Sequence, residues 1–425
     1  NTIVPKKMPL VSLIWGSASH FPVNACTRGD FRAEPRGGDA GPSMASKEAR
    51  TAVVVGAGAI GACTAYFLAK KGLQVTLVEQ TAVACAASGK AGGFLALDWS
   101  DNSPLQALAR ASFSLHRQLA EELDGPSAYG YRSVHTLSVL VQETSSIEST
   151  SRISPTSSTS LPSWINGLGV RTASPIGTPH TTAQVHPLLF TRKIVSVAVE
   201  NYNARILIGK LGDVVIDKAS SHVSAVAVDG TLIPADIVVL AMGPWSARNA
   251  IIAALTSISG LKAHSIVLHP TDTNAITPHA LFLKYRTREG RVMDPEVYPR
   301  PSGEVYVCCM SEEVEVPDDP NQILPRTESI TMLKRVAGNV SLYLQEAEVT
   351  AEQACFLPCS EDGLPLIGQI PEVEGLFVAT GHSCWGILNA PATGASLAEL
   401  IVDGKSQLVD LKAFNPARFA RVLRK

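Results

Sequence analysis

A loop of three glycines followed by an acid is the strongest chemical signal in the sequence. Gly56, Gly58 and Gly61 have G-x-G-x-x-G spacing, and Glu79 follows at the end of the next apolar run. Such glycines allow a tight turn, a close approach of the backbone to a pyrophosphate, and close helix–strand packing. Glu79 can accept hydrogen bonds from ribose hydroxyls and disfavours a 2′-phosphate. The pattern predicts a dinucleotide site at which NADP is the least favoured occupant.

The residues around this loop predict the elements that position it. The run "TAVVV" (51–55) has the β-branched, apolar character of a strand buried on both faces, and 74–79 repeats it. Residues 59–72 predict a helix whose free N–H groups point at the phosphates. We therefore include Ala59, Ile60 and Gln80 among the cofactor contacts.

A second glycine-rich segment follows directly, with the sequence "AASGKAGGFLALDW" at 86–99. Small residues allow the chain to return close to the same pyrophosphate, and Ser88 could donate to a phosphate oxygen. Lys90 could neutralise a phosphate or reach the edge of an isoalloxazine; alternatively the segment is a flexible turn with a solvated lysine. The candidate contacts in this segment are Ser88, Gly89, Lys90, Ala91, Gly92 and Gly93.

Two later segments favour a flavin over a nicotinamide. Residues 212–235 predict a meander with a turn at Asp229-Gly230, and the strand 236–243 ends at Gly243. Residues 375–381 predict another buried strand, followed by a loop over 382–391 and a helix over 392–404. A second helix N-terminus suits the flavin N1/C2 region, which becomes negative on reduction. The contacts predicted here are Val214, Val215, Gly243, Gly381, His382, Gly386 and Ile387. An NAD-dependent dehydrogenase is the weakest alternative, since it leaves the last unit unexplained.

These motifs, in this order, resemble the FAD-dependent D-amino-acid oxidase-like superfamily, which includes glycine oxidase and sarcosine oxidase. The matching stretches are "VVVGAGAIG", "SGKAGGF", "ADIVVLAMGPWS", "YPRPSGEVYV" and "GLPLIGQIPEVEGLFVATGHSCWGI". The spelling "SGKAGGFLALDW" resembles a plant and fungal subgroup of these oxidoreductases. The resemblance implies an α/β fold with a GR2-type Rossmann-like FAD-binding domain and a discontinuous α+β substrate domain built on an antiparallel sheet.

The resemblance also divides the chain. The FAD-binding segments would be 51–98, 184–260 and 350–414, and the substrate-domain segments 99–183 and 261–349. A Ser/Thr-rich stretch at 143–160 predicts a flexible insertion, and 415–425 predicts a basic tail.

In the family a basic residue typically holds the substrate carboxylate, and the resemblance places Arg300 nearest that position, with Tyr298 beside it. The alternative is that "PRPSG" is a tight turn with a solvated Arg300. Arg286 and Arg288 are the fallback candidates, although they suit a charged hairpin tip.

The loop after the last strand carries three side chains that could shape the site. His382 could hydrogen-bond the flavin or the substrate, or be a packing residue. Trp385 could form an aromatic wall or fill core space. Cys384 could form a covalent bond to the flavin, as a cysteine does in some sarcosine oxidases. The loop does not match the attachment position of those enzymes, so we expect FAD to be bound non-covalently. We expect His264 to be structural and His186 to lie at a helix start.

The composition excludes several classes. A formal net charge of −2 gives no excess of positive charge with which to bind nucleic acid. No apolar run approaches the ~20 residues of a membrane span. The cysteines form no CxxC or zinc spacing, so we expect free thiols and no metal. We expect Cys308 and Cys309 to be packing residues on opposite faces of one strand.

Residues 1–50 lack periodicity and predict a disordered leader. They are either a plastid or mitochondrial targeting peptide over 1–43 or sequence upstream of a start at Met44. We expect a soluble intracellular protein, in the cytoplasm or in one of those organelles.

The leading functional hypothesis is oxidation of a C–N bond in an amino acid or related amine by hydride transfer to flavin N5. Oxygen or another acceptor would then reoxidise the flavin. Two alternatives stay open: a dehydrogenase that passes electrons to a partner, and a non-catalytic flavoprotein that acts as an interaction or trafficking module.

Overall fold

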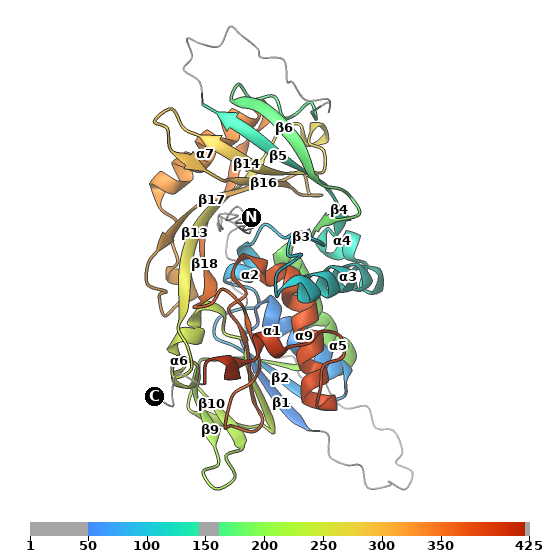
Figure 1. Cartoon of the computed structure of the whole chain (residues 1–425), viewed down its shortest axis with the longest axis vertical. Coiled ribbons are helices and arrows are strands. Elements are labelled where there is room, and N and C mark those ends of the chain that lie inside the picture. The colour runs from blue at the N-terminus through green and yellow to red at the C-terminus, as the bar shows by residue number, and fades with distance from the viewer. Residues whose placement is uncertain (1–49, 144–160, 421–425) are drawn as a thin grey trace, which may run out of the picture.

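The computed structural model describes residues 50–143 and 161–420. Nearly all of the predicted leader, the Ser/Thr-rich insertion and the last five residues of the predicted tail lie outside these residues. Predictions about them, including the compartment, therefore stay predictions. The described part is elongated, with a six-stranded sheet near one end and a larger antiparallel sheet at the other (Figure 1).

The six-stranded sheet carries the first and last sequence motifs. Its strands are, in spatial order, β19 (Leu366–Gln369), β20 (Leu376–Thr380), β12 (Ile237–Leu240), β1 (Thr51–Val55), β2 (Gln74–Glu79) and β8 (Arg205–Ile208). Every pairing is parallel except β19 with β20. Along β1, Ala52 and Val54 join one hydrophobic cluster, while Val53 and Val55 join another. Both faces are thus buried, as the continuous apolar runs predicted.

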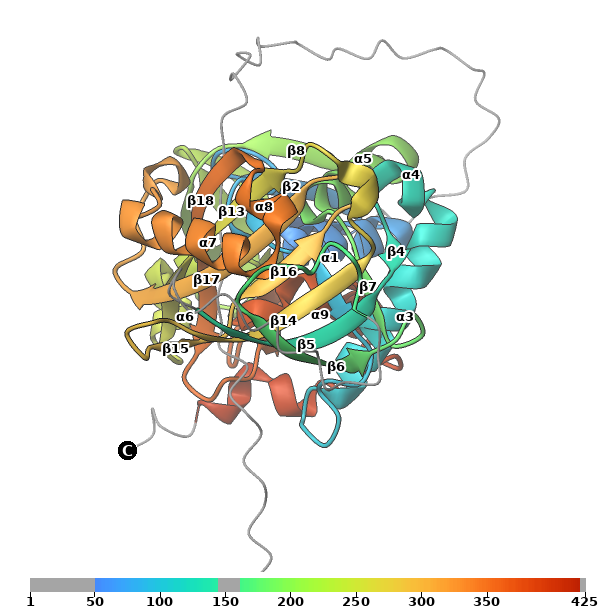
Figure 2. The same cartoon turned by 90° about the horizontal axis from the view of Figure 1, so that it is seen from above.

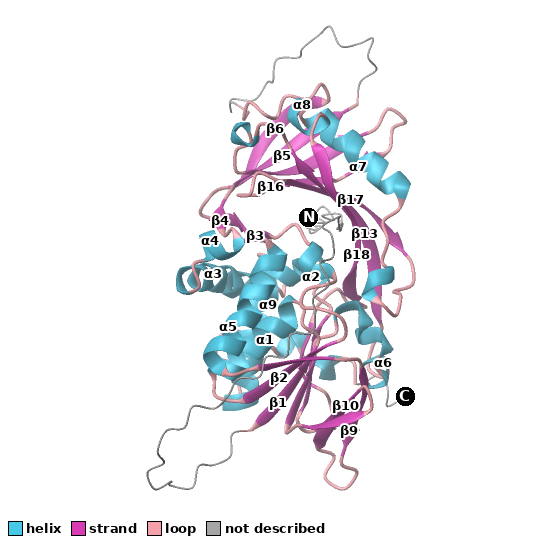
Figure 3. Ribbon diagram, turned by 180° about the vertical axis from the view of Figure 1, so that it is seen from behind, coloured by secondary structure: helices cyan, strands magenta, loops and turns pink. Residues whose placement is uncertain are grey.

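Helices cover one face of this sheet. They are α1 (Ala59–Lys70), α5 (Pro187–Tyr202) and α9 (Gly386–Asp403), with α3 (Gln106–Glu122) and α4 (Gly125–Tyr129) alongside (Figure 3). The helices α1 and α9 touch closely, since a Cβ on Gly394 would lie 2.5 Å from the carbonyl carbon of Cys63. The early and late motifs are therefore packed against each other.

A small meander covers the other face. It consists of β9 (Leu211–Ile216), β10 (Val223–Val228) and β11 (Thr231–Pro234). Asp229 and Gly230 have φ of 46° and 80°, which is the type I′ geometry of a two-residue hairpin. The predicted turn is confirmed. Beyond β12 the chain continues through η1 (Gly243–Arg248) and α6 (Ala250–Ala253).

The large sheet forms the second layer. Its order is β18 (Glu348–Ser360), β13 (Ile258–His269), β17 (Val305–Glu313), β16 (Glu296–Pro299), β14 (His279–Arg286), β5 (His135–Gln142) and β6 (Val170–Gly177), with β15 (Val292–Met293) on β14. All pairings are antiparallel except β14 with β5. Seen from above, its strands lie over α1 and α9 (Figure 2). The helix α7 (Thr327–Val340), followed by α8 (Leu342–Gln345), packs on its outer side.

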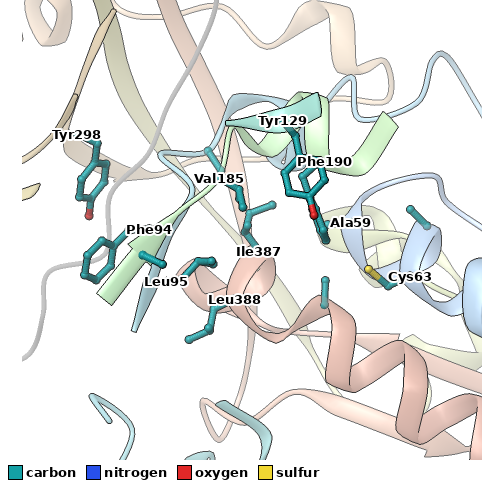
Figure 4. Close-up of a cluster of buried hydrophobic side chains, with 14 of the residues drawn as sticks. Ala59, Cys63, Phe94, Leu95, Tyr129, Val185, Phe190, Tyr298, Ile387 and Leu388 are labelled. Carbon is teal, nitrogen blue, oxygen red and sulfur yellow. The ribbon is translucent and has the colours of Figure 1, made fainter. Parts of the chain in front are cut away.

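A three-stranded sheet joins the two layers. It contains β3 (Phe94–Ala96), β7 (Thr182–Gln184) and β4 (Arg132–Ser133), and the short helix α2 (Ala87–Lys90) precedes it. The hydrophobic core runs through this region, where Phe94, Leu95, Val185, Phe190 and Ile387 belong to one cluster of buried side chains (Figure 4). The predicted α/β class with an antiparallel second part is confirmed.

The start of the last helix was predicted wrongly. Residues 382–391 were expected to form a loop before a helix at 392, but α9 begins at Gly386 and contains Pro391. Proline cannot donate to the carbonyl four residues earlier, and His116 Nε2 hydrogen-bonds that carbonyl, of Ile387, at 2.9 Å. Ser112 Oγ also accepts from the backbone N–H of Ala392 at 3.0 Å. Two side chains of α3 thus replace the helix bonds that the proline disrupts.

Within residues 50–143 and 161–420, no helix is both long and apolar enough to cross a membrane.

Candidate functional site

A cavity of about 580 Å³ extends from the carboxyl ends of β1, β2 and β12 toward β18 of the large sheet. Most of the early candidate residues and several late ones line it together. The predicted contacts among the lining residues are Gly56, Gly58, Ala59, Ile60, Glu79, Gln80, Ser88, Ala91, Gly243, His382, Gly386 and Ile387. Segments at opposite ends of the described chain therefore converge on one space.

Glu79 is held in position by backbone groups at one end of the cavity. Its Oε2 accepts from the N–H of Ala57 at 2.8 Å, and its Oε1 accepts from the N–H of Thr81 at 3.0 Å. These bonds fix the carboxylate at the end of β2, as the ribose-binding acid of a dinucleotide fold requires.

The N-terminus of α1 opens beside this acid. Gly58 occupies its N-cap position without a side-chain cap, and the N–H of Ala59 donates to Ser88 Oγ at 2.8 Å. Gly56 has φ of +103°, and a Cβ there would lie 2.4 Å from the carbonyl oxygen of Ala241. Glycine is therefore required for the turn. An uncapped N-terminus with a nearby hydroxyl suits a pyrophosphate.

The late segment forms the other end of the cavity. Gly386 and Ile387 begin α9 there, so the positive end of an 18-residue helix faces the space. His382 is buried, and its Nε2 hydrogen-bonds Thr393 Oγ1 at 3.0 Å. Burial lowers its pKa to about 3, so the imidazole is neutral. Its Nδ1 has no partner among the described residues, which leaves a buried polar atom for a ligand.

The arrangement fits FAD. An extended cavity of this size holds a ribose-binding acid at one end and two helix N-termini along its length. The unpartnered Nδ1 of His382 lies where α9 begins, at the end expected for the isoalloxazine.

Several predicted contacts do not line the cavity. These are Gly61, Gly89, Lys90, Gly92, Gly93, Gly381, Val214 and Val215. Gly61 packs behind the loop, since a Cβ there would lie 1.8 Å from the carbonyl oxygen of Gly56. Lys90 ends α2 and directly precedes Ala91, which lines the cavity.

Val214 and Val215 lie in β9, while the preceding residues 209–212 line the cavity instead. The sequence predicted the meander but carried no signal that the residues at its start line the cavity.

Tyr298 and Trp385 belong to an aromatic cluster beside the cavity. Tyr298 stacks on Phe94 with ring centroids 5.5 Å apart, and its hydroxyl donates to Glu296 Oε2 at 2.6 Å. Trp385 packs edge-on against Trp99 at 6.4 Å. Neither ring is a lining residue of the cavity.

Arg300 is buried, so the solvated-turn interpretation is wrong. Its Nη1 lies 3.5 Å from both Glu304 Oε2 and His186 Nε2, and its guanidinium carbon lies 5.4 Å from the ring centroid of Tyr306. It is not a lining residue of the cavity. Its carboxylate-binding role stays a prediction.

His186 and His264 do not line the cavity. His186 forms the N-cap of α5, as predicted. His264 Nδ1 hydrogen-bonds the carbonyl of Met310 at 2.7 Å on the far side of the large sheet. Arg286 ends β14.

Sequence reasoning missed a segment that closes one side of the cavity. Asp318 and Pro320 line it, although they come from an acidic connector without a motif. Trp245 Nε1 donates to the carbonyl of Pro317 at 2.7 Å, Gln80 Nε2 donates to that of Asp318 at 3.2 Å, and Arg248 pairs with the Asp318 carboxylate. No spacing in the sequence connects these residues.

The described cysteines are free thiols. Cys384 lines the cavity, and burial raises its pKa, so the thiol stays protonated. No group of three His, Cys, Asp or Glu side chains in the described ranges is placed to hold a metal ion.

Comparison with known proteins agrees with this geometry. A family model described as FAD dependent oxidoreductase (DAO) matches residues 51–400. A Schizosaccharomyces pombe protein that carries only the general name oxidoreductase is 29% identical over 390 residues, covering 86% of this chain and 98% of that protein. Glycine oxidase of Geobacillus kaustophilus is 25% identical over 387 residues, covering 86% and 96%.

Two solved structures share the fold. Glycine oxidase from Geobacillus kaustophilus superposes with a TM-score of 0.70 at 22% identity, covering 87% of this chain and 99% of that one. L-proline dehydrogenase from P. horikoshii gives 0.69 at 21%, covering 88% and 99%. Together with the family match and the cavity, these results show that the chain belongs to the DAO family of FAD-dependent oxidoreductases.

Proposed function

We propose that this enzyme oxidises the C–N bond of an amino acid or related amine. The observation that carries the proposal is the course of the cavity, which reaches from the N-terminus of α9 to Cys355 and Leu357 of the large sheet. A substrate would lie between the flavin ring and that sheet. Relatives named glycine oxidase and L-proline dehydrogenase support an amino acid or amine as the substrate class.

When bound, FAD accepts a hydride at N5. The chain supplies the surroundings for that transfer. The N-terminus of α9 stabilises negative charge at the ligand edge near Gly386 and Ile387. His382 lines the cavity, its ring is held through Thr393, and its Nδ1 has no partner among the described residues. Because the Cys384 thiol is kept protonated by burial, we infer that FAD is held without a covalent bond.

The proposed acceptor for the electrons is oxygen or another oxidant. Relatives with this fold carry the names of both oxidases and dehydrogenases. Hydrogen peroxide measured during aerobic turnover distinguishes the two cases: stoichiometric peroxide identifies an oxidase, and its absence during steady turnover identifies a dehydrogenase.

The test of the proposal is an anaerobic screen of the FAD-loaded protein against glycine, D-amino acids, L-amino acids, sarcosine and simple primary and secondary amines. Loss of the visible flavin absorbance with at least one compound is expected. A Gly58→Asp variant serves as the control, because it places a carboxylate beside Ser88 and the pyrophosphate and should not retain FAD. Failure of every amine in the screen, with a loaded and folded protein, would refute the proposal.

A further inference from the structure

One face of the large sheet points toward the cofactor cavity. Cys355 and Leu357 of β18 line the cavity, and Gln353 lies on the same side of that strand. The register then connects Gln353 to Ser265, Ser265 to Cys308, and Cys308 to Glu296. Directly paired residues of neighbouring strands project to the same side. Glu296 therefore projects from the same side of the sheet as the lining residues of β18, three strands away, although it is not itself a lining residue of the cavity.

Glu296 is an unusual residue for that face. It is only 8% exposed, and no lysine or arginine pairs with it among the described residues. Its Oε2 accepts from the hydroxyl of Tyr298 at 2.6 Å and from Cys308 Sγ at 3.6 Å. Its Oε1 takes part in neither bond. A buried carboxylate without a cationic partner is costly, which suggests that a cation joins it during function.

A cluster of aromatic rings adjoins this carboxylate through Tyr298 and Phe282. Phe94, which stacks on Tyr298, has its ring centroid 5.1 Å from that of Trp99. The ring centroids of Trp99 and Phe282 are 4.7 Å apart. Figure 4 shows the Tyr298 ring beside Phe94. Phe282 is paired with Glu296 in the sheet register. Aromatic faces next to a carboxylate are the combination that binds organic ammonium groups.

The charge of Glu296 acts on one of the residues that line the cavity. Burial raises the pKa of Glu296 to about 7. Burial followed by the charge of Glu296 raises the pKa of Cys384, which lines the cavity. A carboxylate of this kind can take a proton from an ammonium group near neutral pH.

Arg300 has partners of its own. It lies four positions beyond Glu296, past the end of β16, which corresponds to about 13 Å between the two Cα atoms. Glu304 and His186 already contact the guanidinium of Arg300.

We propose that Glu296 is a catalytic residue that binds the cationic nitrogen of the substrate and accepts its proton, so that the enzyme selects amines through their ammonium group. This inference rests on the proposed C–N oxidation. The N–H bond of the ammonium breaks, its proton forms an O–H bond on Glu296, and the nitrogen keeps the electron pair. With FAD bound, the adjacent carbon would then give up a hydride to it, and water would hydrolyse the resulting iminium to a carbonyl compound and an ammonium ion, which keeps the positive charge.

A corollary follows from the proton transfer. Primary and secondary amines can give up the required proton, whereas a quaternary ammonium cannot. We expect tetramethylammonium to bind at Glu296 and to inhibit oxidation without reducing the flavin.

The experiment compares the FAD-loaded wild type with Glu296→Gln. A matched control is Glu312→Gln, because Glu312 lies in the same sheet but pairs with Lys262 and Arg326 on the opposite side. Tetramethylammonium should perturb the flavin spectrum of the wild type and of the control, but not of Glu296→Gln. The rate of anaerobic reduction by any amine that is active in the screen should fall about 100-fold or more in Glu296→Gln.

Two results would overturn the inference: an unchanged reduction rate and pH profile in Glu296→Gln, or a wild-type spectrum that responds to benzoate and not to tetramethylammonium. If Glu296→Gln fails to retain FAD, Trp99→Leu replaces it, with weaker tetramethylammonium binding expected and unchanged binding contradicting the proposal. Because the spectral titration needs no turnover, it tests Glu296 even if no amine reduces the flavin, a result that would refute only the proposed function.

Discussion

At the scale of single residues, His382 and Glu296 are two buried titratable groups that differ in their response to pH. Burial lowers the pKa of His382 to about 3, so this ring stays neutral throughout the useful pH range. Burial raises the pKa of Glu296 to about 7. Any protein group that controls the rate between pH 6 and 8 in this region is therefore expected to be Glu296.

His382→Phe tests the first group. The change keeps a buried ring but removes Nε2, which bonds Thr393, and the free Nδ1. We expect FAD affinity to fall about tenfold, which corresponds to the loss of roughly one hydrogen bond, while the pH dependence of flavin reduction stays unchanged. Fluorescence titration of the apoprotein with FAD measures the affinity, and a shifted pH profile would assign the titration to His382.

The pKa of Glu296 also makes a prediction about stability. The native state holds the Glu296 proton more tightly than the unfolded chain does, whose ordinary value is 4.5. This contribution to stability is therefore complete below pH 4.5 and is lost as the pH rises to about 7. Between pH 4.5 and 8 the free energy of unfolding of the wild-type apoprotein should fall relative to that of Glu296→Gln by up to about 3 kcal/mol. Denaturant titrations of both proteins check this, and parallel curves would show that Glu296 titrates normally.

At the scale of elements, the helix α9 depends on a side chain from elsewhere in the chain. Pro391 removes the donor for the carbonyl of Ile387, and His116 supplies one from α3. The residues around Pro391 predict that it ends a loop. The partner lies 271 residues away in sequence, so the helix start could not be found from the residues around it.

A double-mutant cycle tests this substitution of donors. His116→Leu leaves the buried carbonyl of Ile387 unpaired and should reduce the free energy of unfolding by about 1–3 kcal/mol. Pro391→Ala restores a backbone N–H at the helix position that normally bonds this carbonyl. The double variant should therefore lose less stability than the sum of the single variants, as measured by urea unfolding. Strict additivity would mean that His116 only fills space.

At the scale of the whole molecule, some of the segments around the cofactor cavity could be predicted from the sequence and others could not. The glycine loop, Glu79 and the strand before α9 carried recognisable spacing, and the structure brings them together. Glu296 carried none, because β16 is buried along its whole length and shows no alternation. Only the register of neighbouring strands shows which of its side chains lie on the cavity side of the sheet.

The connector at 315–320 provides a prediction at this scale. Trp245→Phe keeps the aromatic packing but removes the N–H that holds the carbonyl of Pro317. We expect FAD to dissociate several-fold faster, since one buried hydrogen bond is worth about 1 kcal/mol, with little change in the rate of flavin reduction. Arg248→Gln is the comparison, and a smaller effect is expected because the Arg248 and Asp318 side chains are both exposed. Dilution of the holoenzyme followed by flavin fluorescence measures both rates.

The close contact of Gly394 with Cys63 has a consequence for biosynthesis. A ribosome delivers α1 early and α9 only near the end of the described chain, so the nascent polypeptide lacks the α9 side of the cavity during most of translation. We therefore expect FAD to be captured only after α9 has been synthesised.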